Sequence, residues 1–202
     1  APAQAGAAVV PRPTSEPYAG DLGIFETPGR DKKLQIDRVM RLLEIEPGKD
    51  VADIGAGGGW FTVRAARKVG PHGTVFAEEI NSAAVKYIDA RAAKEGLGNV
   101  KTLLGTPDDP KLAPGSVDAV MMLKMYHEIA RPLVVMHKVR DALRPGAKVG
   151  IIDKNGNGSG TDHGVPQATV EREMAEAGFV EVKAYDFTKA DGEDYFLIFR
   201  VR

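Results

Sequence analysis

The chain has 202 residues, 43% of them hydrophobic, and a formal net charge of −1, which suits one domain with a sizeable core. So small a net charge argues against a broad electrostatic grip on nucleic acid, and no apolar run approaches the ~18 residues that span a bilayer. The absence of cysteine excludes disulfides, thiolate metal ligands and a cysteine nucleophile.

The first 30 residues are predicted to form an arm appended to a domain of residues 31–202. The opening stretch APAQAGAAVVPRPTSEP has no periodicity, so we expect it to be disordered or loosely attached. Such a start fits a mature end left by signal-peptide cleavage, and equally a chain trimmed at this point. Four apolar residues later in the arm are expected to pack as a lid: Tyr18, Leu22, Ile24 and Phe25.

Apolar spacing predicts regular elements from Leu34 onward. A helix is indicated by apolar residues at i, i+3, i+4 and i+7, namely Ile36, Val39, Met40 and Leu43. Further helices are expected at 61–68, from the cap Asn81 to Gly96, at 133–143 and at 167–177. Strands are expected at 51–54, 74–80, 99–105, 116–123, 144–153, 180–187 and 194–201.

This alternation predicts an α/β fold: a doubly wound, mostly parallel seven-stranded sheet with helices on both faces. The last two strands lie close together in the chain and are expected to form a closing pair, with the final strand antiparallel. In such sheets ligands bind beyond the carboxyl ends of the strands, near the point where strand order reverses.

A glycine-rich loop, DIGAGGG, follows the first strand at that edge. Glycine permits positive φ and removes Cβ, so a ligand can approach the main chain there. A tight turn alone would need only one glycine. The dinucleotide fingerprint fails in both registers, because Trp60 or Thr62 stands where the third glycine belongs, and no G-K-[ST] follows for a P-loop.

The pattern Asp53-x-Gly55-x-Gly57-x-Gly59 resembles the first motif of class I S-adenosylmethionine-dependent methyltransferases. A carboxylate there suits a ligand that carries an ammonium and a sulfonium and no phosphate. Segments such as FETPGRD, YHEI, ALRPGAKVGIID and DYFLIFR extend the similarity to bacterial small-molecule-type members, over about 25–200. The resemblance implies a Rossmann-like methyltransferase fold and S-adenosyl-L-methionine as cofactor.

The resemblance also implies a set of cofactor-binding residues. Glu79, at the end of the second strand, matches the ribose-binding acid, and Glu78 would then point to the other face. For the adenine, Asp108 and Thr106 remain alternatives, while Asp109 is expected in solvent. The implied set is Asp53, Gly55, Ala56, Gly57, Gly59, Glu79, Ile80, Thr106, Asp108 and Lys124.

Lys124 departs from the Asp, Asn or small residue that relatives often carry at this position. A cation is unfavourable beside a sulfonium, so we expect Lys124 to turn away or to engage a substrate carboxylate. The departure also supports an alternative function, a cofactor-binding protein without catalysis. A nucleotide-dependent oxidoreductase with an altered loop is a further alternative.

Tyr126 and His127 are the candidate catalytic residues on the acceptor side. Tyr126 is expected to stack on cofactor or acceptor or to make a cation–π contact with the sulfonium. His127 is the best-placed base, although a histidine here can also simply order the loop. The long loop DKNGNGSGTDHGVP is either a flap that brings Asp162 and His163 to the site or a solvent loop.

The expected reaction is in-line methyl transfer to an unidentified small molecule, with no nucleic acid partner and no membrane insertion. No pair of histidines has metal-ligand spacing, so the sequence predicts no metal, and His72 and His137 are expected on the surface. The acceptor atom and the oligomeric state stay open. A cytosolic cofactor favours the cytoplasm, against an exported mature form.

Overall fold

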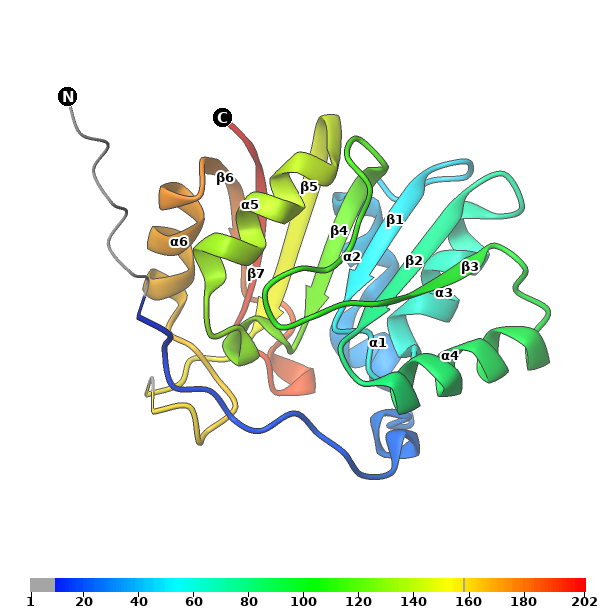
Figure 1. The fold of residues 1–202 in the computed structure, drawn as a ribbon, viewed down its shortest axis with the longest axis horizontal. Coiled ribbons are helices and arrows are strands. Elements are labelled where there is room, and N and C mark those ends of the chain that lie inside the picture. Colours follow the sequence, from blue (N-terminus) through cyan, green and yellow to red (C-terminus); the bar gives the residue numbers. More distant parts are fainter. Residues whose placement is uncertain (1–9, 158) are drawn as a thin grey trace.

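The fold is built on one seven-stranded sheet in the order β3-β2-β1-β4-β5-β7-β6 (Figure 1). The computed structural model describes residues 10–157 and 159–202, so the expectation for residues 1–9 lies outside it. The strands are β1 (Asp50–Ile54), β2 (Thr74–Glu79), β3 (Val100–Leu104), β4 (Val117–Leu123), β5 (Leu143–Asp153), β6 (Phe179–Tyr185) and β7 (Tyr195–Val201). Only β7 runs antiparallel to its neighbours, which confirms the predicted architecture and closing pair.

Helices cover both faces of the sheet, and each face has its own cluster of buried hydrophobic side chains. The helices are α1 (Arg30–Leu34), α2 (Ile36–Leu42), α3 (Trp60–Val69), α4 (Ser82–Lys94), α5 (Pro132–Ala142) and α6 (Gln167–Glu176). Successive strand residues point to opposite faces. Val51 and Met121 therefore pack with α1–α3, whereas Ala52 and Met122 pack with α5 and α6. Among the described residues, no helix has both the length and the apolar character needed to cross a membrane.

Local signals place most element boundaries, with one exception. The side chain of Asn81 caps α4 by accepting a hydrogen bond from Ala83 N at 2.9 Å, as predicted. The helix expected around 36–43 is confirmed as α2. A separate short helix, α1, precedes it and was not predicted; Gln35, with φ 51°, breaks the backbone between the two.

The arm from residue 10 to α1 runs along the carboxyl edge of the sheet (Figure 1). Arg12 anchors it to two elements: Nη1 donates to the Glu173 carboxylate of α6 at 2.9 Å, and the backbone N donates to Ala130 O at 3.0 Å. Tyr18 and Phe25 stack edge to face, with centroids 5.5 Å apart, close to the glycine loop. The arm therefore covers the edge where the sequence predicts a ligand.

Candidate functional site

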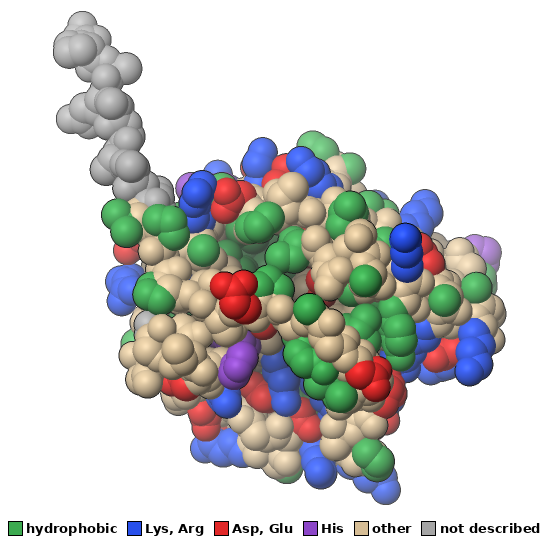
Figure 2. All heavy atoms as spheres, turned by 60° about the horizontal axis from the view of Figure 1, so that its bottom comes forward, with side chains coloured by type: hydrophobic (Ala, Val, Ile, Leu, Met, Phe, Trp, Pro, Cys, Tyr) green, Lys and Arg blue, Asp and Glu red, His purple; other side chains and the backbone are tan. Residues whose placement is uncertain are grey.

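A cavity of about 310 Å³ opens at this edge of the sheet, between the glycine loop and the arm. Figure 2 turns the edge forward and shows hydrophobic side chains gathered around a hollow. The walls come from the β1–α3 loop, the end of β2, the turn after β3, the segment after β4 and the arm. Of the expected lid residues, Tyr18, Leu22 and Phe25 line the cavity, whereas Ile24 is 55% exposed.

The glycine loop presents bare backbone to the cavity. Gly55 and Gly57 have φ of 68° and 58°, a region that side-chain-bearing residues seldom adopt. A Cβ on Gly55 would lie 2.9 Å from the Met125 side chain, and one on Gly57 would lie 3.7 Å from the Phe25 ring. Gly59 instead forms the N-cap of α3 and does not line the cavity.

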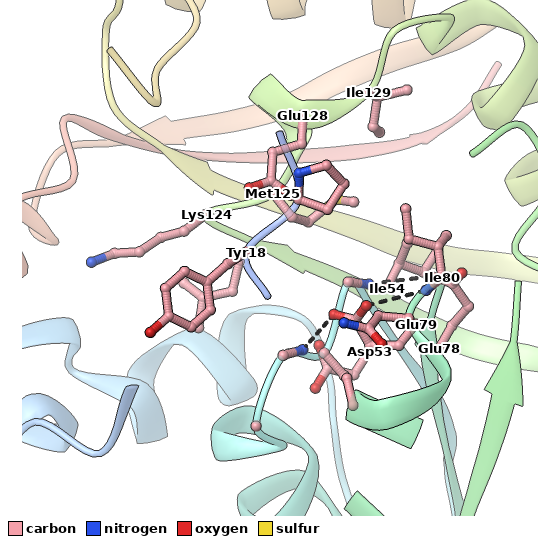
Figure 3. A pocket seen from close by; sticks show the side chains of 18 of the residues that line it. Tyr18, Asp53, Ile54, Glu78, Glu79, Ile80, Lys124, Met125, Glu128 and Ile129 are labelled. Carbon is pink, nitrogen blue, oxygen red and sulfur yellow. Dashed lines mark hydrogen bonds between the residues drawn. The ribbon is translucent and has the colours of Figure 1, made fainter. Parts of the chain in front are cut away.

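Glu78 and Glu79 both reach the glycine loop (Figure 3). Glu79 accepts from Gly57 N at 2.8 Å and from Ile80 N at 3.1 Å, while Glu78 accepts from Gly55 N at 3.3 Å. Glu78 is in register with Ile54, whose side chain packs with α5 and α6, so Glu78 leaves β2 on the other face, as predicted, and its carboxylate still reaches the loop. A Cβ on Gly105 would collide with the Glu78 carboxylate, so the missing side chain at Gly105 makes room for it beside the loop.

These glutamates and Asp53 form a group of poorly solvated carboxyls. Asp53 is 2% exposed and accepts from Thr62 Oγ1 at 2.6 Å. Burial raises the pKa of Asp53 to about 7 and that of Glu78 to about 8, and it also raises the pKa of Glu79. A cation in the cavity would offset this burial by favouring the charged forms.

The raised carboxyl pKa values predict a pH-dependent stability for the free protein. Glu78 binds its proton more tightly in the folded than in the unfolded chain, so its contribution to folding is largest below about pH 4.5 and declines until about pH 8. Glu78→Gln mimics the neutral acid. In urea unfolding, the free energy of unfolding of the variant minus that of the parent should be about 1–3 kcal/mol larger at pH 8 than at pH 5.5. An equal difference at both pH values would contradict the expectation.

The turn after β3 offers Thr106 to the cavity and keeps Asp108 out of it. Thr106 and Pro107 line the wall, where Thr106 N and Asp109 O close a tight turn at 2.9 Å. Asp108 accepts from Arg131 Nη1 at 3.0 Å on the outer surface. Between the two sequence alternatives for the adenine, this geometry favours Thr106.

Lys124 contributes to the cavity wall, but its ammonium group points away from the cavity. Its Nζ is 2.8 Å from Glu193 Oε1 and 3.2 Å from Asp191 Oδ2, at the end of η3 (Lys189–Asp191). Figure 3 shows the side chain directed away from Asp53 and Glu79. Of the two expectations for Lys124, the structure shows the turn away from the site.

Tyr126 does not reach the cavity. The ring is fully buried, its hydroxyl donates to Glu173 Oε2 at 2.9 Å, and the Arg12 guanidinium lies 5.1 Å from the ring centroid. The expected contact with cofactor or acceptor is therefore corrected: the cation that Tyr126 meets is Arg12. Its role here is to anchor the arm and α6 to the loop after β4.

His127 is held firmly by Asp153, the last residue of β5. Its Nδ1 lies 2.9 Å from both Asp153 carboxylate oxygens, and its backbone N donates to Oδ2 at 3.1 Å. Burial lowers the pKa of His127, but Asp153, with Glu128 and Glu193, raises it by more. The other ring nitrogen, Nε2, is buried and has no hydrogen-bond partner among the described residues.

Sequence reasoning missed Asp153 and Glu128, and signals for both were present. Asp153 ends a predicted strand, and it therefore had to reach the same sheet edge as His127. Glu128 follows His127 directly and lines the cavity. His163, from the long loop before α6, has its ring centroid 5.9 Å from that of His127, which fits the flap interpretation of that loop.

Part of the sequence is similar to known methyltransferases. Residues 51–146 match a family described as a methyltransferase domain. Nocamycin O-methyltransferase of Saccharothrix syringae is 36% identical over 117 residues, which cover 56% of this chain and 41% of that protein. Arsenite methyltransferase of Halobacterium salinarum is 28% identical over 125 residues, covering 62% and 32%. The chain thus spans less than half the length of these curated relatives.

Solved structures share the whole architecture. A SAM-dependent methyltransferase from Aquifex aeolicus superposes with a TM-score of 0.80 at 21% identity, covering 90% of this chain and 97% of that one. The [4+2]-cyclase SpnF also superposes, with a TM-score of 0.71 at 15% identity and coverage of 96% and 87%. At these identities the likeness shows the fold alone, and a fold shared with a cyclase does not fix the reaction.

Proposed function

We propose that this chain, which matches a methyltransferase domain in sequence and has the Rossmann-like methyltransferase fold, moves a methyl group from S-adenosylmethionine to a small molecule. The observation that carries the proposal is the cavity itself. A bare glycine backbone faces it, together with three carboxyls that form no ion pair with any residue the structure describes: Asp53, Glu78 and Glu79.

The residues present fit S-adenosyl-L-methionine. When bound, the cofactor supplies an electrophilic methyl group on a sulfonium. Each carboxylate oxygen of Glu79 accepts one backbone hydrogen bond, which leaves lone pairs for two ribose hydroxyls. Gly55, Ala56 and Gly57 let the ligand approach the main chain, and Thr106 would face the adenine. The charged carboxyls favour a cationic ligand, whereas they would repel a pyrophosphate.

The opposite wall supplies the acceptor side. Asp153 fixes the His127 ring, and we propose that Nε2 accepts a proton from the attacking group if that group must lose one. Much of the acceleration in an in-line displacement comes from holding nucleophile and methyl in line. The arm and the segment after β4 enclose this side, which supports a small-molecule acceptor.

Calorimetry with S-adenosylmethionine, S-adenosylhomocysteine and NAD tests the proposal. We expect both adenosyl ligands to bind one per chain and NAD to bind at least ~10-fold more weakly. Tight NAD binding without adenosyl binding would favour an oxidoreductase and reject the proposal. Adenosyl binding without turnover on a broad acceptor panel would favour a binding protein, an alternative weakened by the position of Lys124, which is already paired with Glu193.

A matched glycine pair tests whether the loop contacts the ligand. Gly57→Ala places a methyl between the loop and the Phe25 ring, whereas Gly70→Ala, with φ 68°, places one in open space at the start of the turn before β2. Gly70→Ala strains the backbone severely, because φ 68° with ψ −169° is a combination that essentially only glycine adopts, so strain alone cannot explain a loss confined to Gly57→Ala. Calorimetry should show at least ~10-fold weaker cofactor binding for Gly57→Ala and little change for Gly70→Ala. Equal affinities in the two variants would remove the loop from the site.

A further inference from the structure

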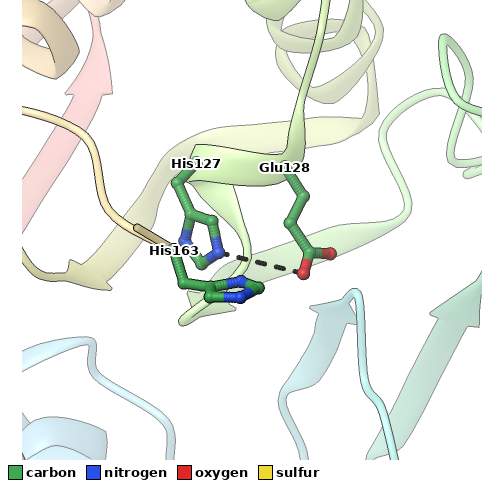
Figure 4. A group of neighbouring side chains, drawn as sticks. All are labelled: His127, Glu128 and His163. Carbon is green, nitrogen blue, oxygen red and sulfur yellow. Dashed lines mark ion pairs between the residues drawn. The ribbon is translucent and has the colours of Figure 1, made fainter. Parts of the chain in front are cut away.

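Three potential metal ligands converge beside the cavity: His127, Glu128 and His163 (Figure 4). Each offers one ligand atom, and these atoms all lie within 4.8 Å of one another. Two of the residues come from η2 (Tyr126–Glu128), and the third comes from the loop between β5 and α6. His163 is far from the adjacent pair His127 and Glu128 in the sequence, so no spacing motif could show the group.

The buried imidazole is already arranged as a metal ligand would be. His127 is 7% exposed, and its Nε2 faces the group without a hydrogen-bond partner among the described residues. Its Nδ1 lies 2.9 Å from both oxygens of the buried Asp153. A carboxylate on the far nitrogen is the usual companion of a metal-bound histidine, because it fixes the ring and raises its basicity.

The loop that carries His163 is tied to the sheet at its base. Val165 N donates to Lys154 O at 2.9 Å, and Gln167 N donates to Asn155 Oδ1 at 2.9 Å. These bonds keep the loop beside η2. His163 itself adopts φ 53°, an uncommon conformation for a residue other than glycine, and its ring meets that of His127 edge to face.

We propose that His127 Nε2, the Glu128 carboxylate and His163 bind one divalent first-row transition-metal ion. Two histidines and one carboxylate with open positions form a known kind of site for such ions. Ligand bonds of about 2.0–2.2 Å need ligand atoms about 3–3.5 Å apart. His127 Nε2 and Glu128 Oε1 are 3.8 Å apart and all the ligand atoms lie within 4.8 Å of one another, so side-chain movements on the order of 1 Å would bring the group to these spacings.

The site faces the acceptor side, since Glu128 lines the cavity. The role of the ion rests on the proposed methyl transfer: an open position would take a hydroxyl oxygen of the acceptor and lower its pKa, so that the hydroxyl proton passes to bulk water before the oxygen attacks. His127 would then hold the ion and would not itself take the proton. Metal binding as such does not depend on that role and is measured without cofactor or acceptor.

Metal binding can be tested on the full chain after dialysis against a chelator. Calorimetry with Zn²⁺ and visible absorption with Co²⁺ should both give one ion per chain. Glu128→Gln and His163→Gln should each weaken binding at least ~10-fold. His72→Gln and His137→Gln, which change exposed histidines elsewhere, should bind like the parent.

Two results would overturn the proposed metal site. One is the absence of stoichiometric binding of either ion to the parent, and the other is equal affinity in all four variants. Circular dichroism of each variant checks that it is folded. Cofactor calorimetry on the same samples separates the two proposals, because failure to bind S-adenosylmethionine would reject the methyltransferase function and leave the metal result standing.

Discussion

His127→Asn is expected to lower methyl transfer at least ~100-fold while cofactor affinity stays within about twofold of the parent. Asparagine can still donate to Asp153, so the buried carboxylate keeps a partner and the fold is preserved. The variant loses only the nitrogen that faces the acceptor side. Single-turnover assays with the best acceptor of a panel measure the rate, and calorimetry with S-adenosylmethionine measures the affinity.

Comparison variants locate the origin of the loss. Asp153→Asn should lower the rate less than His127→Asn, since it removes the group that orients the ring and keeps the ring itself. His137→Asn changes an exposed histidine on α5 and should behave like the parent. Unaltered turnover in His127→Asn would end any role of His127 in the reaction, as proton acceptor or as metal ligand.

The metal and the base interpretations differ in one further measurement. If His127 acts as a base in metal-free protein, removal of metal by a chelator leaves the parent rate unchanged. If it holds an ion that activates the acceptor, the chelator lowers the parent rate, and Zn²⁺ or Co²⁺ restores it. His163→Gln should reproduce the chelator effect in the second case only.

The sequence was sufficient for the features that depend on local pattern. The strands expected at 51–54 and 116–123 are β1 and β4, and both are largely buried, as apolar strands covered on both faces should be. The three alternating glycines predicted positive φ, and Gly55, Gly57 and Gly59 all show it. The acid at the end of β2 was expected beside that loop, and Glu79 contacts Gly57 there.

Features that depend on distant partners could not be predicted in the same way. Tyr126 does not reach the cavity because its side chain contacts Glu173 and Arg12, which lie far from it in the chain. Asp108 is drawn outward by Arg131. Alternation along β2 places Glu78 on the face opposite to Glu79, but it could not show that the Glu78 carboxylate reaches Gly55 N through the space that Gly105 leaves open.

The convergence of His127 with His163 illustrates the same limit on the acceptor side. A ligand motif is visible in sequence only when its members share one element, as in a helix that carries two histidines a turn apart. Here the fold, through the parallel pairing of β4 and β5, brings the ends of both strands to one edge. The two following loops meet there, and their side chains become neighbours.

Glu79→Gln is expected to weaken binding of S-adenosylmethionine by about 1–3 kcal/mol, because the ribose hydroxyls lose a charged acceptor. Glu78→Gln is the matched comparison on the same strand. Glu78 also contacts the loop backbone, but it is only 3% exposed and has less surface to offer a ligand. Calorimetry should therefore show a smaller loss for Glu78→Gln than for Glu79→Gln.

The two cofactor forms reveal which part of the ligand Glu79 contacts. S-adenosylmethionine and S-adenosylhomocysteine carry the same ribose, but only the first carries a sulfonium. Equal losses for both ligands in Glu79→Gln would identify a hydrogen bond to the sugar. A loss confined to the cationic ligand would indicate a through-space attraction between the carboxylate and the sulfonium. No loss with either ligand would remove Glu79 from the cofactor site altogether.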